Sequence, residues 1–180
     1  MKTKERFLFL DFDGVLNSDS YYRRQHDRGL RCSDGFGPFF DPEAVGNLGL
    51  ILQAVPKTRI VVISSWKDIH GLAGLRDMWS QRHLPGTLYS ATITSLHQQL
   101  INEDLSDPAA FARVEGEYKA REILTWMAAN DALRAPYVII DDAVGFPPEL
   151  QPHHVRTDPD VGLTLFDAEK AVQILNNNGH

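Results

Sequence analysis

The stretch from Phe7 to Asn17, FLFLDFDGVLN, constrains the fold most, because an apolar run ends there in two carboxylates. Phe7 to Leu10 has the length and the aromatic content of a strand covered on both faces, as in the centre of a parallel sheet. Asp11 and Asp13 follow where this strand ends, and Gly14 allows the backbone to turn sharply after them. We therefore expect both carboxyl groups to converge at the end of a central strand.

Two carboxylates this close repel each other unless a cation or a proton lies with them. Oxygen ligands favour a hard ion, and a site with few carboxylates and room for phosphate oxygens suits Mg²⁺ better than Zn²⁺. The alternative is that Asp13-Gly14 is only a turn after a strand. The other strands of the chain have to decide between these two interpretations.

Length and composition favour one soluble α/β domain that spans residues 1–180. The chain has 43% apolar and 23% charged residues, with no run long enough to cross a membrane. The apolar run before Asp11 is too short for a secretion signal, so a cytoplasmic location is expected. Cys32 is the only cysteine, which excludes an internal disulfide and a cysteine-based metal site. The net charge of -6 argues against general affinity for nucleic acids.

Apolar segments alternate between strand-like and helix-like patterns along the chain. Strands are predicted at Arg59–Ile63, Thr87–Ile93, Tyr137–Ile140 and near Val155. Helices are predicted after Asp41, over Lys67–His83, over Glu117–Asn130, and after a capping box formed by Thr164 and Asp167. Two segments lack such a pattern and are predicted to be a long surface loop, Ser18–Phe40, and an acidic exposed connection, Asn102–Pro108. This alternation predicts a three-layer α/β/α fold with a doubly wound parallel sheet.

Three of the predicted strands end in polar side chains. These are Asp11 and Asp13, Ser64 and Ser65, and Asp141 and Asp142. Parallel strands bring their carboxyl ends to one edge of the sheet, where such sheets bind ligands. Helix N-capping by Ser65 or Asp142 is the alternative explanation for those two residues.

Together these motifs resemble the four motifs of the haloacid dehalogenase-like (HAD) superfamily: Asp-x-Asp-Gly-Val, Ile-Ser-Ser-Trp, a basic residue opening a later helix, and Ile-Asp-Asp. Two further patterns are similar to the small HAD domains associated with Swiss Army Knife RNA repair proteins. They are Lys-x-x-Glu-Ile-x-x-Trp at Lys119–Trp126 and Thr-Asp-x-x-x-Gly-Leu-Thr at Thr157–Thr164. The resemblance implies a HAD-like Rossmannoid fold.

The resemblance also implies a Mg²⁺-dependent phosphohydrolase, a phosphomonoesterase that forms an aspartyl-phosphate. Asp11 would be the nucleophile, and Asp13 would be the general acid that later acts as the base. Asp142 would bind Mg²⁺ together with Asp11 and the backbone carbonyl of Asp13. Asp141 would be either a further metal ligand or a partner of one.

According to the resemblance, residues of the remaining two motifs bind the phosphoryl group and neutralise its negative charge. Ser64 would donate a hydrogen bond to a phosphoryl oxygen, and Lys119 would neutralise its charge. Ser65 is the alternative donor. We prefer Ser64 because Ser64 follows the apolar run immediately. Arg121 is the alternative to Lys119 as the residue that contacts the phosphate. The spacing to Ile123 favours Lys119.

No large cap domain is expected over the site. The two intervals in which this superfamily inserts caps, Asn17–Arg59 and Trp66–Tyr118, contain only elements that the basic fold can use. An open site would suit a bulky or polymeric substrate. Arg23 and Arg24, in a locally basic segment beside the site, are predicted to bind substrate groups beyond the transferred phosphate. The alternative for this segment is a merely solvated loop.

The expected partner is a phosphorylated small molecule or the terminal phosphate of a nucleic acid, with no membrane and no stable protein partner. The alternative function is a non-catalytic module that binds phosphate or metal and recognises a partner. Asp13 argues against that alternative, because superfamily members without this second acid tend not to hydrolyse phosphoesters. Trp66 and Trp126 are expected to pack in the core or on the sheet.

Overall fold

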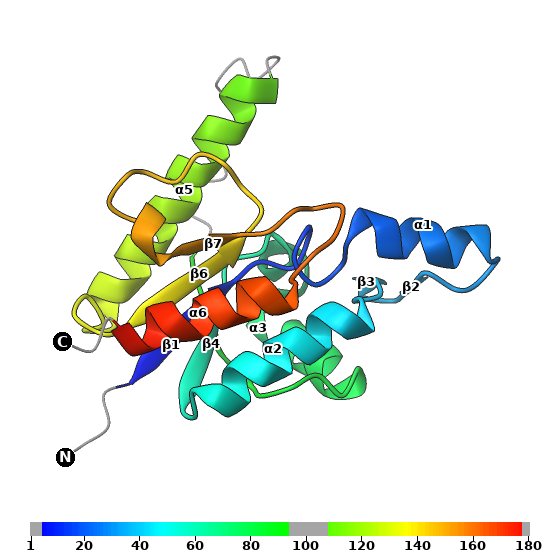
Figure 1. The fold of residues 1–180 in the computed structure, drawn as a ribbon, viewed down its shortest axis with the longest axis horizontal. Helices are drawn as coiled ribbons and strands as arrows, with labels where there is room; N and C mark the ends of the chain where they lie inside the picture. Colours follow the sequence, from blue (N-terminus) through cyan, green and yellow to red (C-terminus); the bar gives the residue numbers. More distant parts are fainter. Residues whose placement is uncertain (1–4, 94–107, 178–180) are drawn as a thin grey trace.

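Five parallel strands form one sheet with the order β5-β4-β1-β6-β7 (Figure 1). The structure is a computed structural model that describes residues 5–93 and 108–177. The strands are β1 (Arg6–Leu10), β4 (Thr58–Val62), β5 (Leu88–Ala91), β6 (Tyr137–Asp141) and β7 (His154–Arg156). Because β1 pairs in parallel with both β4 and β6, its predicted central position is confirmed.

Helices cover both faces of the sheet, so the predicted α/β doubly wound architecture is confirmed. They are α2 (Pro42–Ala54), α3 (Trp66–Gln81), α5 (Pro108–Ala129) and α6 (Leu165–Asn177), with a short 3₁₀ turn at Gln151–His153. Buried side chains of α2, α3 and α6 pack on one face, and those of α5 pack on the other. Within the described residues, no separately folded lid lies over the carboxyl ends of the strands.

The chain builds the sheet outward from β1 in two directions. It passes from β1 to β4 and β5 on one side and then crosses to β6 and β7 on the other. The carboxyl ends of β1, β4 and β6 therefore meet where the direction of winding reverses, which is the usual ligand-binding place in such sheets. None of the helices in the described part of the chain has the length and apolar character needed to span a membrane.

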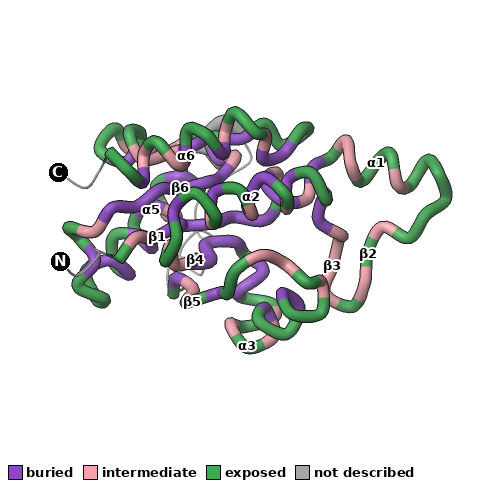
Figure 2. Tube along the Cα trace, turned by 60° about the horizontal axis from the view of Figure 1, so that its bottom comes forward, coloured by how far each residue is buried: buried purple, intermediate pink, exposed green. Residues whose placement is uncertain are grey.

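Residues 18–40 are not the long loop that the sequence predicted. They form helix α1 (Asp19–Asp27) and a small hairpin of β2 (Ser33–Asp34) and β3 (Gly37–Pro38). The hydroxyl of Ser18 caps the helix by accepting a hydrogen bond from the Tyr21 amide at 3.3 Å. No residue of α1 is buried, and the helix extends away from the sheet (Figures 1 and 2). The prediction was wrong because α1 is strongly polar and has no buried residue, so no apolar stripe marks it in the sequence.

Two other boundaries differ from the prediction or lie beyond it. Helix α5 begins at Pro108, well before the predicted start at Glu117, and the predicted acidic connection lies outside the described residues except for Pro108. The capping box is confirmed, because the Thr164 hydroxyl donates to Asp167 at 2.6 Å and accepts from its amide at 3.2 Å.

His154 on β7 makes folding sensitive to acid. Its Nε2 lies 3.0 Å from the main-chain carbonyl oxygen of Asp141, and burial lowers the pKa of His154 from 6.5 to about 4. The folded protein thus keeps this imidazole neutral, whereas the unfolded chain takes up a proton below its ordinary pKa. Stability contributed by the neutral ring is therefore lost as the pH falls from about 6.5 to about 4.

We expect His154→Gln to weaken this acid dependence, because the glutamine amide can still donate to the carbonyl but does not titrate. Between pH 6.5 and 4 the wild type should lose up to about 3 kcal/mol more unfolding free energy than the variant. Urea unfolding at several pH values measures this difference. His26→Gln, at an exposed position on α1, is the control. Parallel curves for wild type and His154→Gln would contradict the assignment.

Candidate active site

The alternation of side chains along the strands decides which groups meet at the carboxyl edge. Phe7 and Phe9 on β1 face helix α5, and Asp11 continues that series. Tyr137 and Ile139 on β6 face the same helix, and Asp141 continues their series. Both carboxylates are therefore delivered to the face that α5 covers.

Lys119 on α5 meets both of these carboxylates. Its Nζ lies 2.6 Å from Oδ2 of Asp11 and 3.0 Å from Oδ1 of Asp141, and Glu115 lies 3.3 Å away. Asp11 is 5% exposed and Asp141 is fully buried. Burial lowers the pKa of Lys119, but the charges of Asp11 and Asp141 outweigh it and raise that pKa. The ammonium thus stays charged and balances carboxylates removed from water.

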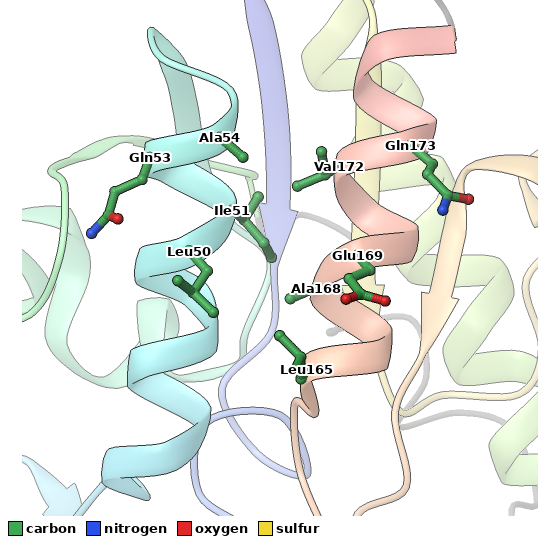
Figure 3. A pocket seen from close by; sticks show the side chains of 9 residues that line it. All are labelled: Leu50, Ile51, Gln53, Ala54, Leu165, Ala168, Glu169, Val172 and Gln173. Atoms are coloured by element: carbon green, nitrogen blue, oxygen red, sulfur yellow. The ribbon is translucent and has the colours of Figure 1, made fainter.

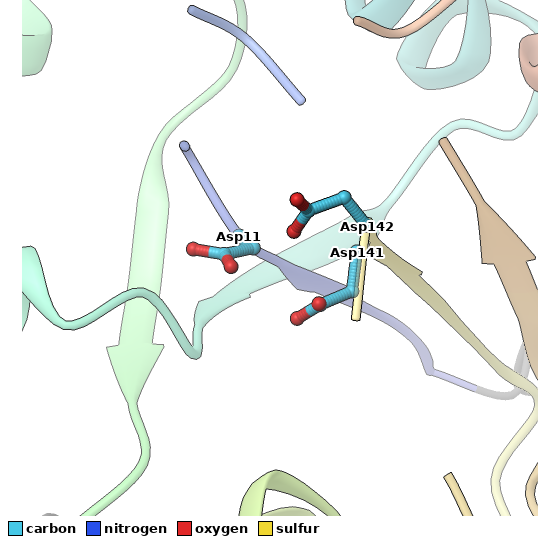
Figure 4. A group of neighbouring side chains, drawn as sticks. All are labelled: Asp11, Asp141 and Asp142. Atoms are coloured by element: carbon cyan, nitrogen blue, oxygen red, sulfur yellow. The ribbon is translucent and has the colours of Figure 1, made fainter. Parts of the chain in front are cut away.

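Three carboxylates gather where β1 and β6 end (Figure 4). Ligand atoms of Asp11, Asp141 and Asp142 lie within 4.8 Å of one another. Burial, followed by the charge of Asp11, raises the pKa of both Asp141 and Asp142. Like charges held this close favour either a proton or a cation.

The residues present fit a hard divalent cation. All three donors are carboxylates, and Oδ2 of Asp141 is buried without a directed hydrogen bond, although Lys119 Nζ lies 2.9 Å away. Gly14 keeps the place beside Asp142 clear, because a Cβ atom there would lie 2.5 Å from Oδ2 of Asp142. A donor set made only of carboxylate oxygens suits Mg²⁺.

Asp13 lies at the mouth of this cluster rather than within it. Asp13 is exposed, and its side chain is not one of the three carboxylates that form the cluster. Trp66 Nε1 donates to Oδ2 of Asp13 at 2.9 Å, and Asn17 Nδ2 donates to Oδ1 at 2.6 Å. Trp66 packs in the core as predicted, but its hydrogen bond to Asp13 was not predicted from the sequence.

The two serines after β4 face different surroundings. Ser64 is fully buried and its hydroxyl accepts a long hydrogen bond of 3.5 Å from the Trp66 amide, whereas Ser65 is exposed and lines the cavity. In this structure Ser65 therefore has the accessible hydroxyl, and which serine contacts a phosphoryl group stays a prediction. Ser65 is the N-cap of α3, and its hydroxyl makes no capping hydrogen bond.

A cavity of about 310 Å³ opens between the strand ends and α5. Its lining includes Asp11, Asp13, Ser65, Lys119, Asp142 and Tyr118. Arg121, the competitor of Lys119 in the sequence, is exposed and lies over the Tyr118 ring.

The same cavity is bordered by a buried ion pair that was not predicted from the sequence. Lys67 Nζ lies 3.2 Å from Oε2 of Glu122, and Thr92 donates to the same oxygen at 2.7 Å. Glu122 follows Lys119 by about one helical turn, so this pair ties α5 to the segment after β4. The two residues are far apart in sequence, and no local pattern predicts that they pair.

Arg23 and Arg24 do not reach the carboxylate cluster in this structure. Arg23 pairs with Asp160, and Arg24 lies 3.4 Å from Asp41 and 3.1 Å from Ser20. Both side chains are more than half exposed on α1, whose first turn follows directly after Asn17. Their predicted contact with substrate stays a prediction.

A larger concave surface lies away from this chemistry. A groove of about 590 Å³ runs between α2 and α6 and is lined mainly by apolar side chains (Figure 3). It contains one acid, Glu169, beside residues such as Leu50, Ile51 and Leu165. It shares no residue with the cavity at the strand ends.

The position of Lys119 depends on a close backbone contact one turn earlier in α5. A Cβ atom at Gly116 would lie 2.2 Å from the carbonyl carbon of Gly145 and 2.4 Å from its Cα. Only a residue without a side chain lets the helix approach the segment after β6 this closely. That approach brings Lys119 within reach of Asp11 and Asp141.

Comparison with known protein families gives a match that covers most of the chain. The model of the HAD domain in Swiss Army Knife RNA repair proteins matches residues 7–168. No curated protein matches the chain, and no solved structure does. The matched range contains every residue of the carboxylate cluster and Lys119.

We predict that Gly116→Ala destabilises the protein by roughly 1–3 kcal/mol, because the added methyl group collides with the Gly145 backbone. Gly46→Ala is the matched control, since Gly46 is exposed in α2 and a Cβ there meets no atom within 4 Å. It should stabilise the helix by about 0.5–1 kcal/mol. Urea unfolding measures both effects. A Gly116→Ala protein as stable as wild type would refute the close contact.

Proposed function

Because the chain belongs to the family of HAD domains found in Swiss Army Knife RNA repair proteins, we propose that it is a Mg²⁺-dependent phosphomonoesterase. The observation that supports this proposal is the arrangement of four side chains at the carboxyl edge of the sheet. Asp11 lies in contact with Lys119, Asp142 lies beside Asp11, and Asp13 stands at the mouth of the same cavity. This set can supply a nucleophile, positive charge, a cation site and a proton donor.

In the first proposed step, a carboxylate oxygen of Asp11 attacks the phosphorus atom of the monoester. A bond forms between this oxygen and phosphorus, and the bond from phosphorus to the leaving oxygen breaks. The leaving oxygen keeps that electron pair and takes a proton from Asp13. The products are an aspartyl-phosphate at Asp11 and the free alcohol.

In the second proposed step, water attacks the phosphorus of the aspartyl-phosphate while Asp13 removes a proton from it. The bond between phosphorus and the Asp11 oxygen breaks, and its electron pair returns to Asp11. Inorganic phosphate leaves, and both carboxyl groups recover their first protonation states. Asp13 thus acts as acid and then as base, which suits its position at the mouth of the cavity.

Positive charge and hydrogen-bond donors are proposed to hold the phosphoryl group during both steps. Lys119 would contact a phosphoryl oxygen, and the exposed hydroxyl of Ser65 would donate to another. Asp11, Asp142 and the backbone carbonyl of Asp13 would bind Mg²⁺, with Asp141 as a further ligand or as the partner that fixes Lys119. The ion would offset the repulsion between these carboxylates and the phosphate.

The test of this mechanism is the hydrolysis of an aryl phosphate by wild type and by Asp11→Asn. We expect Mg²⁺-dependent turnover by wild type that is abolished by a chelator. Asp11→Asn keeps the side-chain shape but removes the nucleophile, so its kcat should fall by at least about 10³-fold. Equal rates in the two proteins would exclude the mechanism. Metal and phosphate binding without any turnover by wild type would instead favour a non-catalytic binding module.

A phosphate at the end of a nucleic acid is the substrate class that we propose for this site. The family is described from RNA repair proteins, and the described residues leave the cavity without a folded lid. Helix α1 begins just after Asn17 and carries the exposed Arg23 and Arg24. Arginine binds phosphate through paired hydrogen bonds, so neighbouring nucleotides of a chain could lie along this helix.

We predict that the double change Arg23→Ala and Arg24→Ala raises KM for a phosphorylated oligonucleotide by roughly 10-fold or more and weakens its salt dependence. Turnover of a small aryl phosphate should stay nearly unchanged, because that compound does not reach α1. Arg134→Ala is the control, since Arg134 is exposed just before β6, at the opposite edge of the sheet. An unchanged KM for oligonucleotides, nucleotides and sugar phosphates alike would rule out substrate binding by these arginines.

A further inference from the structure

The carboxylate of Asp13 is held at both oxygens by hydrogen-bond donors from two separate parts of the chain. Trp66, the first residue of α3, donates from Nε1 to Oδ2 at 2.9 Å. Asn17, in the turn after β1, donates from Nδ2 to Oδ1 at 2.6 Å. Neither donor is charged, so they orient the carboxyl group without pairing it with a cation.

The indole of Trp66 is itself fixed in place. Trp66 is 6% exposed, and its ring meets Phe12 edge to face with centroids 5.7 Å apart and Phe40 at 5.6 Å. The guanidinium of Arg82 lies 5.8 Å from its ring centroid. A side chain packed on this many sides has little freedom to turn its N–H away from Asp13.

The hairpin of β2 and β3 closes the remaining side of this indole. A Cβ atom at Gly37 would lie 2.9 Å from Cη2 of Trp66, so the hairpin backbone lies directly against the ring. Arg82 fastens the hairpin, donating to both oxygens of Asp34 at 2.7 and 3.0 Å and to the Pro38 carbonyl at 2.9 Å. The segment between α1 and α2 therefore buttresses Trp66.

We propose that Trp66 is a positioning residue for proton transfer by Asp13, with Asn17 as the second holder and the β2–β3 hairpin as the buttress. This inference rests on the role of Asp13 in the proposed function. A proton donor must keep its oxygen within about 2.6–3.2 Å of the leaving oxygen while the bond to phosphorus breaks. An exposed carboxylate on a turn would rotate freely unless its oxygens were held.

Asn17 has a further property that suits a group that changes protonation state. Its Oδ1 is buried and has no hydrogen-bond partner in the part of the chain that the structure describes. Before the substrate binds, a protonated Asp13 carries an O–H that needs an acceptor, and rotation of the Asn17 amide would present one. In the first step the leaving oxygen replaces Asn17 as that acceptor. The amide can thus serve Asp13 in both states, whereas the indole of Trp66 can only donate.

The test compares kcat/KM of Trp66→Phe and wild type on a series of phosphate monoesters, from dinitrophenyl phosphate to a simple alkyl phosphate. This ratio reports the steps up to formation of the aspartyl-phosphate, so it excludes the later base step of Asp13 that all esters share. A good leaving group departs without a proton, whereas an alkoxide needs the proton of Asp13. General acid catalysis contributes about 10²–10⁴-fold, so Trp66→Phe should lose roughly 10-fold or more on the alkyl ester and little on the dinitrophenyl ester. Asn17→Ala removes the other donor and should change the series in the same direction.

The chain offers matched controls for this change. Trp79 lies in the same aromatic cluster, 5.9 Å from Phe12, and donates to the Pro85 carbonyl at 3.1 Å. Trp126 packs on the other face and donates to Ser90 at 3.0 Å. Trp79→Phe and Trp126→Phe each remove an indole N–H from the core without touching Asp13. They should alter all esters by the same factor.

Asp13→Asn separates failure of this inference from failure of the proposed function. It should show the full dependence on the leaving group, and if it does not, Asp13 is not the proton donor. If Asp13→Asn shows the dependence but Trp66→Phe and Asn17→Ala lower all esters equally, the positioning role is overturned while the mechanism stands. Thermal unfolding of each variant shows that the rates come from folded protein.

Discussion

Burying two carboxylates side by side at the end of the sheet depends on the ammonium of Lys119. Asp11 and Asp141 lie in neighbouring strands at the same height, and either one removed from water without a counter-charge would cost several kcal/mol. Lys119 reaches both, and its own position follows from the contact between Gly116 and Gly145. The packing of α5 on the sheet therefore also supplies the positive charge that stabilises the two buried carboxylates.

The two acids of the first motif receive opposite environments although one residue separates them. Asp11 is buried against a cation, whereas Asp13 is exposed and held by two neutral donors. Pairs of carboxyl groups in unlike surroundings can take different chemical roles on one fold. This contrast follows from the tight turn that begins at Phe12, whose carbonyl accepts from the Val15 amide, and that uses the positive φ of Gly14. Asp13 lies within this turn and therefore leaves the alternation that places Asp11 under α5.

The sequence predicts the sheet well because its strands are apolar runs that need burial on both faces, as at Phe7–Leu10 and Tyr137–Ile140. The exposure of Ser65 and the burial of Ser64 depend on the turn into α3, which the apolar run of the strand does not predict. Other features have no local signal. Helix α1 buries nothing, and the contacts of Trp66 with Asp13 and of Lys67 with Glu122 join distant segments only after folding.

The separation between the cavity and the α2–α6 groove has a practical meaning for protein engineering. Along α5 the side chains that close the core alternate with those that meet the carboxylates, so a substitution chosen to improve packing there also shifts Lys119. The groove contributes no residue to the cavity, and its exposed Leu50 and Leu165 can be varied without moving that helix. Stability can therefore be improved at the α2–α6 groove, on the face of the sheet opposite α5, without changing the cavity.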